Sequence, residues 1–395
     1  MSADPAEDAT VILGAGYAGL AVWHAVHRRA RGAWPVVLVD RHPLHVVRTE
    51  LYQVDRLAAD EGADLAWALP LRELLRDSPD ALRTGTVGSI DAVRREVVVD
   101  GTPLPFRDLA ICLGSAPNYY GVPGAEERTF SVYRLSHARK LAQAIRDLES
   151  RRAQGGGAPR IVVVGGGTTG VEVAADIATA RWSKIVGHDV PSPEVLLVVG
   201  RLPFLDGLAV RLRTHARQLL RRAAVRLDEG RNVTRVASDH LELERGDPVG
   251  FDLCVWAAGN QPAAVVRTAG LPLGRGGRLV VGPTLEVPDH PGIFALGDVA
   301  YLVDARTGAP VPATAQAALA EATVAGRNLV ARRRGRPLQE FVYRPKGDIV
   351  EIGLGQASGE VAGLTVWGRS ASTVKALVEK GHRLTAPRGG KPPGL

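Results

Sequence analysis

The chain has 395 residues, of which 45% are apolar and 23% charged, and this composition is typical of a folded protein of two or three domains. Its formal net charge is +7, and only six of the 49 basic residues are lysines, so the positive charge reflects an arginine-rich composition. We therefore expect no nucleic-acid partner. The N-terminus is acidic and no apolar stretch reaches the roughly 18 residues that span a bilayer. We therefore expect a cytoplasmic protein without a signal peptide, in contact at most with the inner face of the cell membrane.

The first predicted unit is a strand, a glycine-rich turn and a helix. The apolar strand 10–13 leads into Gly14-Ala15-Gly16-Tyr17-Ala18-Gly19 and a helix from about Gly16 to Arg31, and a second strand, 36–39, ends at Asp40. In this context the three glycines allow a tight turn, the approach of a pyrophosphate to the backbone and helix-on-strand packing. The phosphates would meet free N–H groups at the positive end of the helix dipole. A dinucleotide site at Gly14, Gly16, Gly19 and Asp40 is predicted.

Between this unit and the next we expect a short helix over 64–80, a hairpin over 86–99 with the turn dipeptide Asp100-Gly101, and a strand over 109–113. A helix over about 134–150 and a glycine-rich linker at 155–159 come after them.

The second unit repeats the order of the first around Gly165-Gly166-Gly167-Thr168-Thr169-Gly170. Its strand, helix and second strand are expected at 161–164, 169–181 and 195–199. Two such units in one chain predict two bound nucleotides, between which electrons usually pass. Further elements are expected as a helix at 207–223, a strand ending in Ala257-Ala258-Gly259, a return to the first domain at 293–300, a helix at 313–331, cap strands at 341–355 and a helix near 372–380.

The expected fold class is α/β, with two Rossmann-like dinucleotide-binding domains, the second inserted in the first, and a small C-terminal cap. The expected boundaries are 1–125 and 291–340 for the first domain, 126–290 for the second and 341–395 for the cap. The two cysteines, Cys112 and Cys254, lie in separate apolar segments without a C-x-x-C pairing. Neither a disulfide framework, a metal site nor a dithiol redox centre is predicted.

Taken together, these segments resemble the two-dinucleotide-domain flavoproteins and, within them, the type II NADH dehydrogenases, over nearly the whole chain. Single segments are shared by many flavoprotein reductases, whereas the Asn-aromatic-aromatic-Gly-x-Pro-Gly, Ala-Thr-Ala-Gln and Lys-Gly segments together are more specific. Besides the glycine turns and Asp40, the matching segments are 50–53, 113–115, 118–124, 167–172, 257–259, 297–298, 312–318 and 343–347.

The resemblance implies FAD in the first domain, with its pyrophosphate on the first glycine turn, its adenosine ribose on Asp40 and Asp298 accepting from ribityl or pyrophosphate-side hydroxyls. NADH or NADPH would lie on the second turn and pass a hydride from nicotinamide C4 to flavin N5. The protein would orient the cofactors and exclude water. The cofactor-binding residues implied in this way also include Gly114, Gly165, Gly167, Gly170, Gly259 and Gly297.

The resemblance also implies a quinone as the acceptor of two electrons, without proton pumping. Gln316 and Lys346 are the candidate catalytic residues on the acceptor side of the flavin. The chain departs from the family here, because Ala320 replaces a second glutamine that lines the acceptor site. Sulfide:quinone oxidation is disfavoured, since it needs redox cysteines beside the flavin.

Glu172 is the third candidate catalytic residue and has two interpretations. Thr169-x-x-Glu172 fits a capping box, in which each side chain satisfies a backbone N–H at the helix start. The resemblance instead places Glu172 near the nicotinamide ring, which it would orient. The two interpretations are compatible.

A second departure concerns the nicotinamide nucleotide. Val199 occupies the position at which an acid normally ends the second strand, and Arg201 comes two residues after it. Loss of the acid together with a nearby arginine is the pattern that accommodates a 2′-phosphate. Either the protein accepts NADPH as well as, or better than, NADH through Arg201, or Arg201 points to solvent.

The C-terminal segment has Trp367 and then Val374, Leu377 and Val378 at helical spacing, accompanied by Lys375 and Lys380. We expect this helix to pack against its own domain or a second copy in a homodimer rather than to insert into a membrane. The basic run 332–336 either contacts lipid phosphates or interacts favourably with the negative end of the helix dipole.

Two other functions stay open. One is a soluble flavin reductase of the same fold that serves an electron-carrier protein or a quinone of specialised metabolism. The other is a redox-sensing protein that holds FAD and NAD(P)H but turns over slowly.

Overall fold

The computed structural model of the protein describes residues 8–59, 67–75, 78, 81–152 and 157–385. The acidic segment 1–7, part of the helix expected over 64–80 and residues 155–156 of the expected linker lie outside these ranges.

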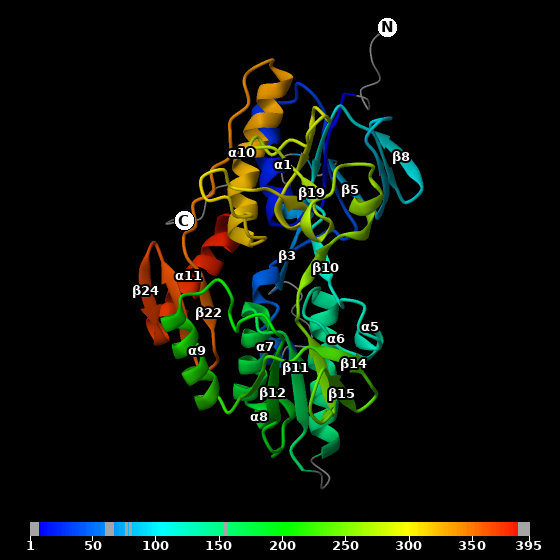
Figure 1. The fold of residues 1–395 in the computed structure, drawn as a ribbon. Coiled ribbons are helices and arrows are strands. Elements are labelled where there is room, and N and C mark those ends of the chain that lie inside the picture. The colour runs from blue at the N-terminus through cyan, green and yellow to red at the C-terminus, as the bar shows by residue number, and fades with distance from the viewer. Residues whose placement is uncertain (1–7, 60–66, 76–77, 79–80, 153–156, 386–395) are drawn as a thin grey trace.

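The first domain is built on a five-stranded parallel sheet in the order β20-β9-β1-β2-β5. The central strands β1 and β9 are buried along their whole length, as expected for a parallel sheet covered on both faces. Helices α1 (Tyr17–Ala30) and α10 (Ala315–Arg333) lie side by side against it, at the top of Figure 1. The five strands are β1 (Thr10–Leu13), β2 (Val36–Asp40), β5 (Leu82–Thr84), β9 (Asp108–Ile111) and β20 (Ile293–Ala295).

The second domain is built on a four-stranded parallel sheet in the order β13-β12-β11-β17, at the bottom of Figure 1. The chain leaves the first sheet after β9 and returns to it at β20, so the second sheet is inserted in the first domain, as the sequence predicts. The strands are β11 (Arg160–Val164), β12 (Glu194–Val199), β13 (Arg226–Glu229) and β17 (Leu253–Trp256). Its helices are α6 (Leu135–Arg152), α7 (Thr168–Thr179), α8 (Trp182–Val186) and α9 (Val210–Arg222).

The two connections between the domains pair with each other. Strand β10 (Ser115–Pro117) leads out of the first domain and β18 (Asn260–Pro262) leads back, and the two form an antiparallel ribbon. Figure 1 shows β10 at the level between the two domains. Both crossings therefore occur at one place.

The C-terminal cap is an antiparallel sheet and one helix, beside α7 and α9 (Figure 1). Its strands are β22 (Ile349–Glu351), β23 (Ala357–Val361) and β24 (Leu364–Trp367). The strands expected over 341–355 are thus mostly shifted toward the C-terminus. Helix α11 (Gly368–Thr385) has 18 residues and is twice as long as the segment 372–380 expected from its apolar spacing.

Most predicted helices and strands lie within a few residues of their expected bounds, but the helix over 64–80 is wrong in the described part. There β4 (Ala68–Pro70) pairs with β3 (Leu44–Val46) and interrupts the helical residues, which are Trp67 and the single turn α4 (Leu71–Leu74). The Asp100-Gly101 turn is confirmed, with φ of 47° and 76°, the left-handed pair that a two-residue hairpin requires. It joins β7 (Glu96–Val99) to β8 (Thr102–Pro105), and β6 (Val87–Asp91) completes a three-stranded sheet.

The remaining elements are short. They are α2 (Val54–Ala59), α5 (Ala125–Arg128), β14 (Val233–Val236), β15 (His240–Leu243), β16 (Val249–Gly250), β19 (Leu279–Val280) and β21 (Ala300–Tyr301).

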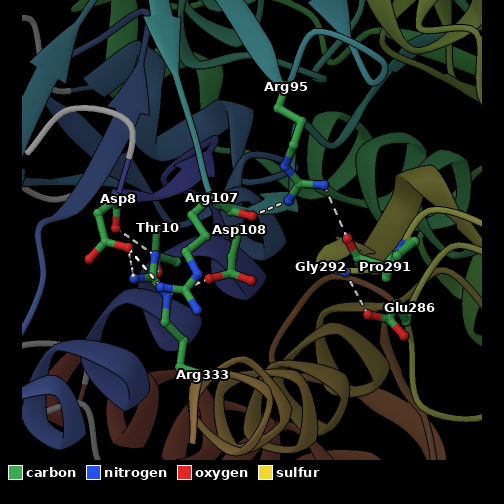
Figure 2. Close-up of polar contacts among 9 residues, drawn as sticks. All are labelled: Asp8, Thr10, Arg95, Arg107, Asp108, Glu286, Pro291, Gly292 and Arg333. Atoms are coloured by element: carbon green, nitrogen blue, oxygen red, sulfur yellow. Dashed lines mark hydrogen bonds and ion pairs between the residues drawn. The ribbon is translucent and has the colours of Figure 1, made fainter. Parts of the chain in front are cut away.

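A buried arginine fastens the end of α10 to the start of the first sheet (Figure 2). Arg333 Nε lies 2.5 Å from Asp108 Oδ2, and the side chains of both residues are 4% exposed. Its other nitrogens donate to the Asp8 carboxylate (3.0 Å) and the Thr10 hydroxyl (3.2 Å). The guanidinium also stacks over Trp34, 4.9 Å from the ring centroid. Asp108 would be left as a buried unpaired carboxylate without this side chain.

The variant Arg333→Met is expected to lower the free energy of unfolding by about 3 kcal/mol, because removing one partner of a buried pair leaves the other as an uncompensated buried charge. Urea denaturation measures this. Arg334→Met is the matched control, since Arg334 is exposed and its side chain donates to the Arg29 carbonyl (2.8 Å), so its loss should cost less than about 1 kcal/mol. Equal losses in the two variants would contradict the assignment.

Candidate active site

Both glycine turns open onto one cleft of about 1070 Å³ between the two domains. It lies at the carboxyl ends of β1, β9, β11 and β12, where open α/β sheets bind their ligands. The predicted site residues that line it are Gly16, Gly114, Gly165, Gly167, Glu172, Arg201, Gly259, Gly297 and Asp298.

The glycines of each turn divide into two kinds. A Cβ on Gly19 would lie 1.7 Å from the Gly14 carbonyl oxygen, and one on Gly170 would lie 1.9 Å from that of Gly165, so these positions serve helix-on-strand packing. A Cβ on Gly16 or Gly167 would meet nothing within 4 Å. These two residues are the N-caps of α1 and α7, and neither helix has a side-chain cap. Two uncapped helix N-termini with open space before them fit two pyrophosphate groups.

The two predicted acids of the first domain differ in their accessibility. Asp40, at the end of β2, accepts from the Ala15 N–H (2.7 Å) and the His42 N–H (2.9 Å) and is not among the residues that line the cleft. Its carboxylate fixes the glycine turn itself. Asp298 does line the cleft, and it accepts from the Tyr133 hydroxyl (3.1 Å) and from the Ser115 hydroxyl.

Asp298 stands in a small polar group that faces the cleft. Arg48 Nη1 lies 3.7 Å from the Asp298 carboxylate, and its guanidinium stacks over Tyr133, 4.0 Å from the ring centroid. Burial raises the pKa of Tyr133, so this hydroxyl keeps its proton and donates. The group thus offers a cofactor a carboxylate acceptor beside cationic and hydroxyl donors.

A second carboxyl holds the Gly297-Asp298 turn from behind. Glu321, from α10, is 3% exposed and accepts from the Gly297 N–H at 2.6 Å. Burial raises its pKa from 4.5 to about 8. Because the folded state binds this proton more tightly than the unfolded chain, the proton stabilises the folded protein. This contribution to the free energy of unfolding is complete below pH 4.5 and is lost as the pH rises through about 8.

Replacing the carboxyl by an amide removes this pH dependence. Glu321→Gln is expected to match the parent protein near pH 5 and to exceed its unfolding free energy near pH 9, where the parent buries a charge. Thermal unfolding across this range measures the difference, with Glu340→Gln, an exposed position, as the control. Parallel pH profiles for Glu321→Gln and the parent would exclude a protonated Glu321.

Glu172 does not form the capping box that its spacing to Thr169 suggests. Helix α7 begins at Thr168 and its N-cap is Gly167, so the side chain of Glu172 is left free for other partners. Its carboxylate accepts from the Glu351 N–H of the cap (3.2 Å) and from the Lys375 ammonium. The capping-box interpretation is therefore wrong, and Glu172 faces the cleft.

Lys375 is a site residue that the sequence pattern did not reveal. The pattern groups it with Lys380 as a flanking charge, but its side chain is 11% exposed and lines the cleft. Its ammonium lies 4.2 Å from the Tyr52 ring centroid and 3.9 Å from the Glu379 carboxylate. The sequence signal for this residue was its spacing to Glu379, because residues four apart on one helix face can form an ion pair.

The cluster around Lys375 contains more carboxyl groups than cations. Burial lowers the pKa of Lys375, but the surrounding carboxylates, Glu172 first, outweigh burial and raise it. Burial also raises the pKa of Glu172, and it raises that of Glu379 to about 8. Glu351 adds a carboxylate that accepts from the hydroxyls of Tyr52 (3.2 Å) and Ser372 (2.9 Å). One ammonium faces several acids here, and burial raises the pKa of Glu172 and of Glu379, so the cluster favours protonation of a carboxyl.

Gln316 and Lys346 come together, but outside the lining of the cleft. The Gln316 carboxamide oxygen accepts from the Lys346 N–H (2.9 Å) and the Tyr343 hydroxyl (3.2 Å), and its NH₂ donates to the Gly347 carbonyl (3.3 Å). The amide therefore joins the start of α10 to the loop 343–347. Their predicted role toward an acceptor stays a prediction, while neighbouring Ala315 and Asp348 do line the cleft.

The sequence of the chain matches a known protein family over most of its length. A family model described as pyridine nucleotide-disulphide oxidoreductase matches residues 8–322. The chain belongs to this family.

Two curated relatives and one solved structure share nearly the full length. The chain is 28% identical over 373 residues to the NADH dehydrogenase-like protein YutJ of Bacillus subtilis, covering 93% of this chain and 96% of that protein. It is 29% identical over 381 residues to the demethylphylloquinone reductase NdbB of Synechocystis, covering 93% and 90%. NDH2 from Plasmodium falciparum, solved in complex with NADH, shares the fold with a TM-score of 0.80 at 14% identity, over 97% of this chain and 96% of that one.

Although the family name includes a disulphide, the two cysteines of this member are both free and buried, in strands or strand ends of different sheets. Burial raises the pKa of both thiols. Neither forms a dithiol pair with the other, in agreement with their spacing in the sequence.

Helix α11 of the cap leaves two of its apolar residues exposed. Leu377 and Val378 are 62% and 37% exposed, whereas Lys375 and Glu379 face inward. Helix α11 does pack on the strands of its own cap, with Ala371 buried, so the expected packing on its own domain is confirmed, while packing on a second copy stays a prediction. In the basic run, Arg332 pairs with Glu286 (2.9 Å), and Arg333 and Arg334 also have partners inside the chain. Among the described residues, no helix combines the length and apolar character needed to cross a bilayer.

Proposed function

We propose that the protein is an FAD-dependent NAD(P)H:quinone oxidoreductase. The observation that carries this proposal is that two uncapped glycine turns, from two different sheets, open onto the same cleft. Two dinucleotides bound there would share one water-excluding space. The names of the relatives YutJ and NdbB support the electron donor and the quinone acceptor.

The first domain would hold FAD through the N-terminus of α1 at Gly16 and through Asp298, with Arg48 and Tyr133 beside it. When bound, FAD supplies two-electron chemistry between a nicotinamide and an acceptor. Asp40 contributes by fixing the turn through the Ala15 N–H, and Glu321 contributes by fixing Gly297. The residues of the chain thus bind and orient.

The second domain would hold the nicotinamide nucleotide at Gly167 and the N-terminus of α7. Glu172, one turn into that helix, lies between this domain and the cap through its contacts with Glu351 and Lys375. A quinone takes up two protons when it is reduced. Among the carboxyl groups around Lys375, Glu172 lines the cleft and has a pKa raised by burial, so it is placed to supply one.

The variant Glu172→Gln tests this role. We expect its kcat with a quinone acceptor to fall by roughly 100-fold, because the amide cannot exchange a proton, while anaerobic reduction of the flavin by NADH keeps its rate. Glu194→Gln is the matched control, since Glu194 is 55% exposed at the amino end of β12 and pairs with Arg160. Slowed flavin reduction with unchanged reoxidation would instead favour a nicotinamide-orienting role.

The proposed activity itself is tested on the purified protein. We expect bound FAD, rapid bleaching of its absorbance by NADH or NADPH, and reoxidation by menaquinone or ubiquinone analogues. Stopped-flow absorbance measures both steps, with and without anionic liposomes. A stable reduced flavin that no quinone reoxidises would contradict the proposal and favour another acceptor or a redox-sensing role.

A further inference from the structure

Strand β12 of the second domain ends without an acid, but a carboxylate from another part of the chain lies beside its end. The buried side chain of Val199 ends β12, and Gly200 and Arg201 continue from it into the cleft. Glu244, which comes directly after β15, brings its carboxylate to the same place and also lines the cleft. Its oxygens lie 3.1 Å from Arg201 Nη2 and 3.1 Å from Arg201 Nε.

The position of Glu244 is fixed by Asn232. The Asn232 N–H and side-chain NH₂ donate to the two carboxylate oxygens at 3.2 and 3.1 Å. The Asn232 carboxamide oxygen accepts from the Arg201 N–H at 3.1 Å, and a Cβ on Gly200 would lie 2.5 Å from that oxygen. A glycine after β12 therefore lets Asn232 close against the strand end. The hydrogen bonds from Asn232, together with Arg201, lower the pKa of Glu244, so it is ionised at neutral pH.

The arginines at this end of the cleft are already paired. Arg201 gives Nε and Nη2 to Glu244, and Arg231 pairs with Asp228 and donates to the Arg245 carbonyl (2.8 Å). A 2′-phosphate would have to enter beside the Glu244 carboxylate, whose negative charge would repel it. A ribose with free hydroxyls would find an acceptor instead.

We propose that Glu244 takes the place of the missing strand-end acid: it accepts from the adenosine ribose hydroxyls of the nicotinamide nucleotide and makes the site select NADH over NADPH. This inference rests on the proposed function, since it assumes that the second glycine turn binds such a nucleotide. Arg201 acts as a positioning residue, because it reaches the ribose site through Glu244.

Binding measurements separate this inference from turnover. Isothermal titration of the FAD-loaded protein with ADP-ribose and with 2′-phospho-ADP-ribose reads the ribose site without an electron acceptor. We expect the parent protein to bind ADP-ribose at least 10-fold more tightly. In Glu244→Gln, which removes the charge, keeps the shape and frees Arg201, we expect this ratio to fall by a factor of about 10 or more. The kcat/KM ratio for NADH and NADPH should shift in parallel.

Two further variants sharpen the test. Glu242→Gln, on β15, removes a partly exposed carboxylate that pairs with Arg235 outside the cleft, and it should leave the binding ratio unchanged. Arg201→Ala should retain the preference for ADP-ribose. A parent protein that prefers the 2′-phosphorylated ligand and loses it in Arg201→Ala would overturn the assignment, as would an unchanged ratio in folded Glu244→Gln. If neither ligand binds at all, the proposed nicotinamide site fails together with this inference.

Discussion

The contact of a helix with a strand through bare backbone is the constraint on which the rest of the structure depends. At Gly19 and Gly170 the space for a side chain is filled by the carbonyl of the preceding turn, so each helix starts directly above the end of its strand. This places the positive ends of α1 and α7 at the rim of one cleft. Helix α10 packs along α1, and it carries Glu321 against Gly297 and Arg333 against Asp108. The same packing therefore fixes both the Gly297-Asp298 turn and the start of the first sheet.

The cap changes the electrostatics of this cleft. Its helix α11 turns a lysine and a glutamate inward and leaves leucine and valine outward, the reverse of an ordinary amphipathic surface helix. A buried ammonium among several carboxyl groups is costly unless every charge finds a partner, and Glu172, Glu351 and Tyr52 supply these partners from three parts of the chain. The cap, the second domain and the segment around Tyr52 are therefore held together by charge at the point where they meet the cleft.

The sequence was sufficient for the architecture because that architecture is determined by local patterns. Buried apolar runs such as Val11–Leu13 and Ile161–Val164 predict parallel strands, and each glycine turn predicts the helix that begins after it. The roles of individual polar side chains were harder, because they depend on contacts far apart in the sequence. Thr169 and Glu172 satisfy a local capping pattern. The N-cap of α7 is nevertheless Gly167, and the Glu172 side chain contacts Lys375 of the C-terminal cap instead. Glu244 and Lys375 reach the cleft only through folding. No local pattern marks Glu244, and the spacing of Lys375 and Glu379 pairs these two residues without placing them at the cleft.

The paired crossing strands have a consequence for how the molecule is divided. Because β10 and β18 are hydrogen-bonded to each other, the second domain starts and finishes at a single narrow stem. A homologous second domain could therefore be joined on without rerouting the first sheet, provided that it kept the surface on which α2 packs against α6, α7 and α8. Rotation about the stem would have to break this packing of α2, so the stem is not a free hinge. Under the proposed function, such an exchange would change the nicotinamide-binding side of the cleft and leave the flavin-binding side in place.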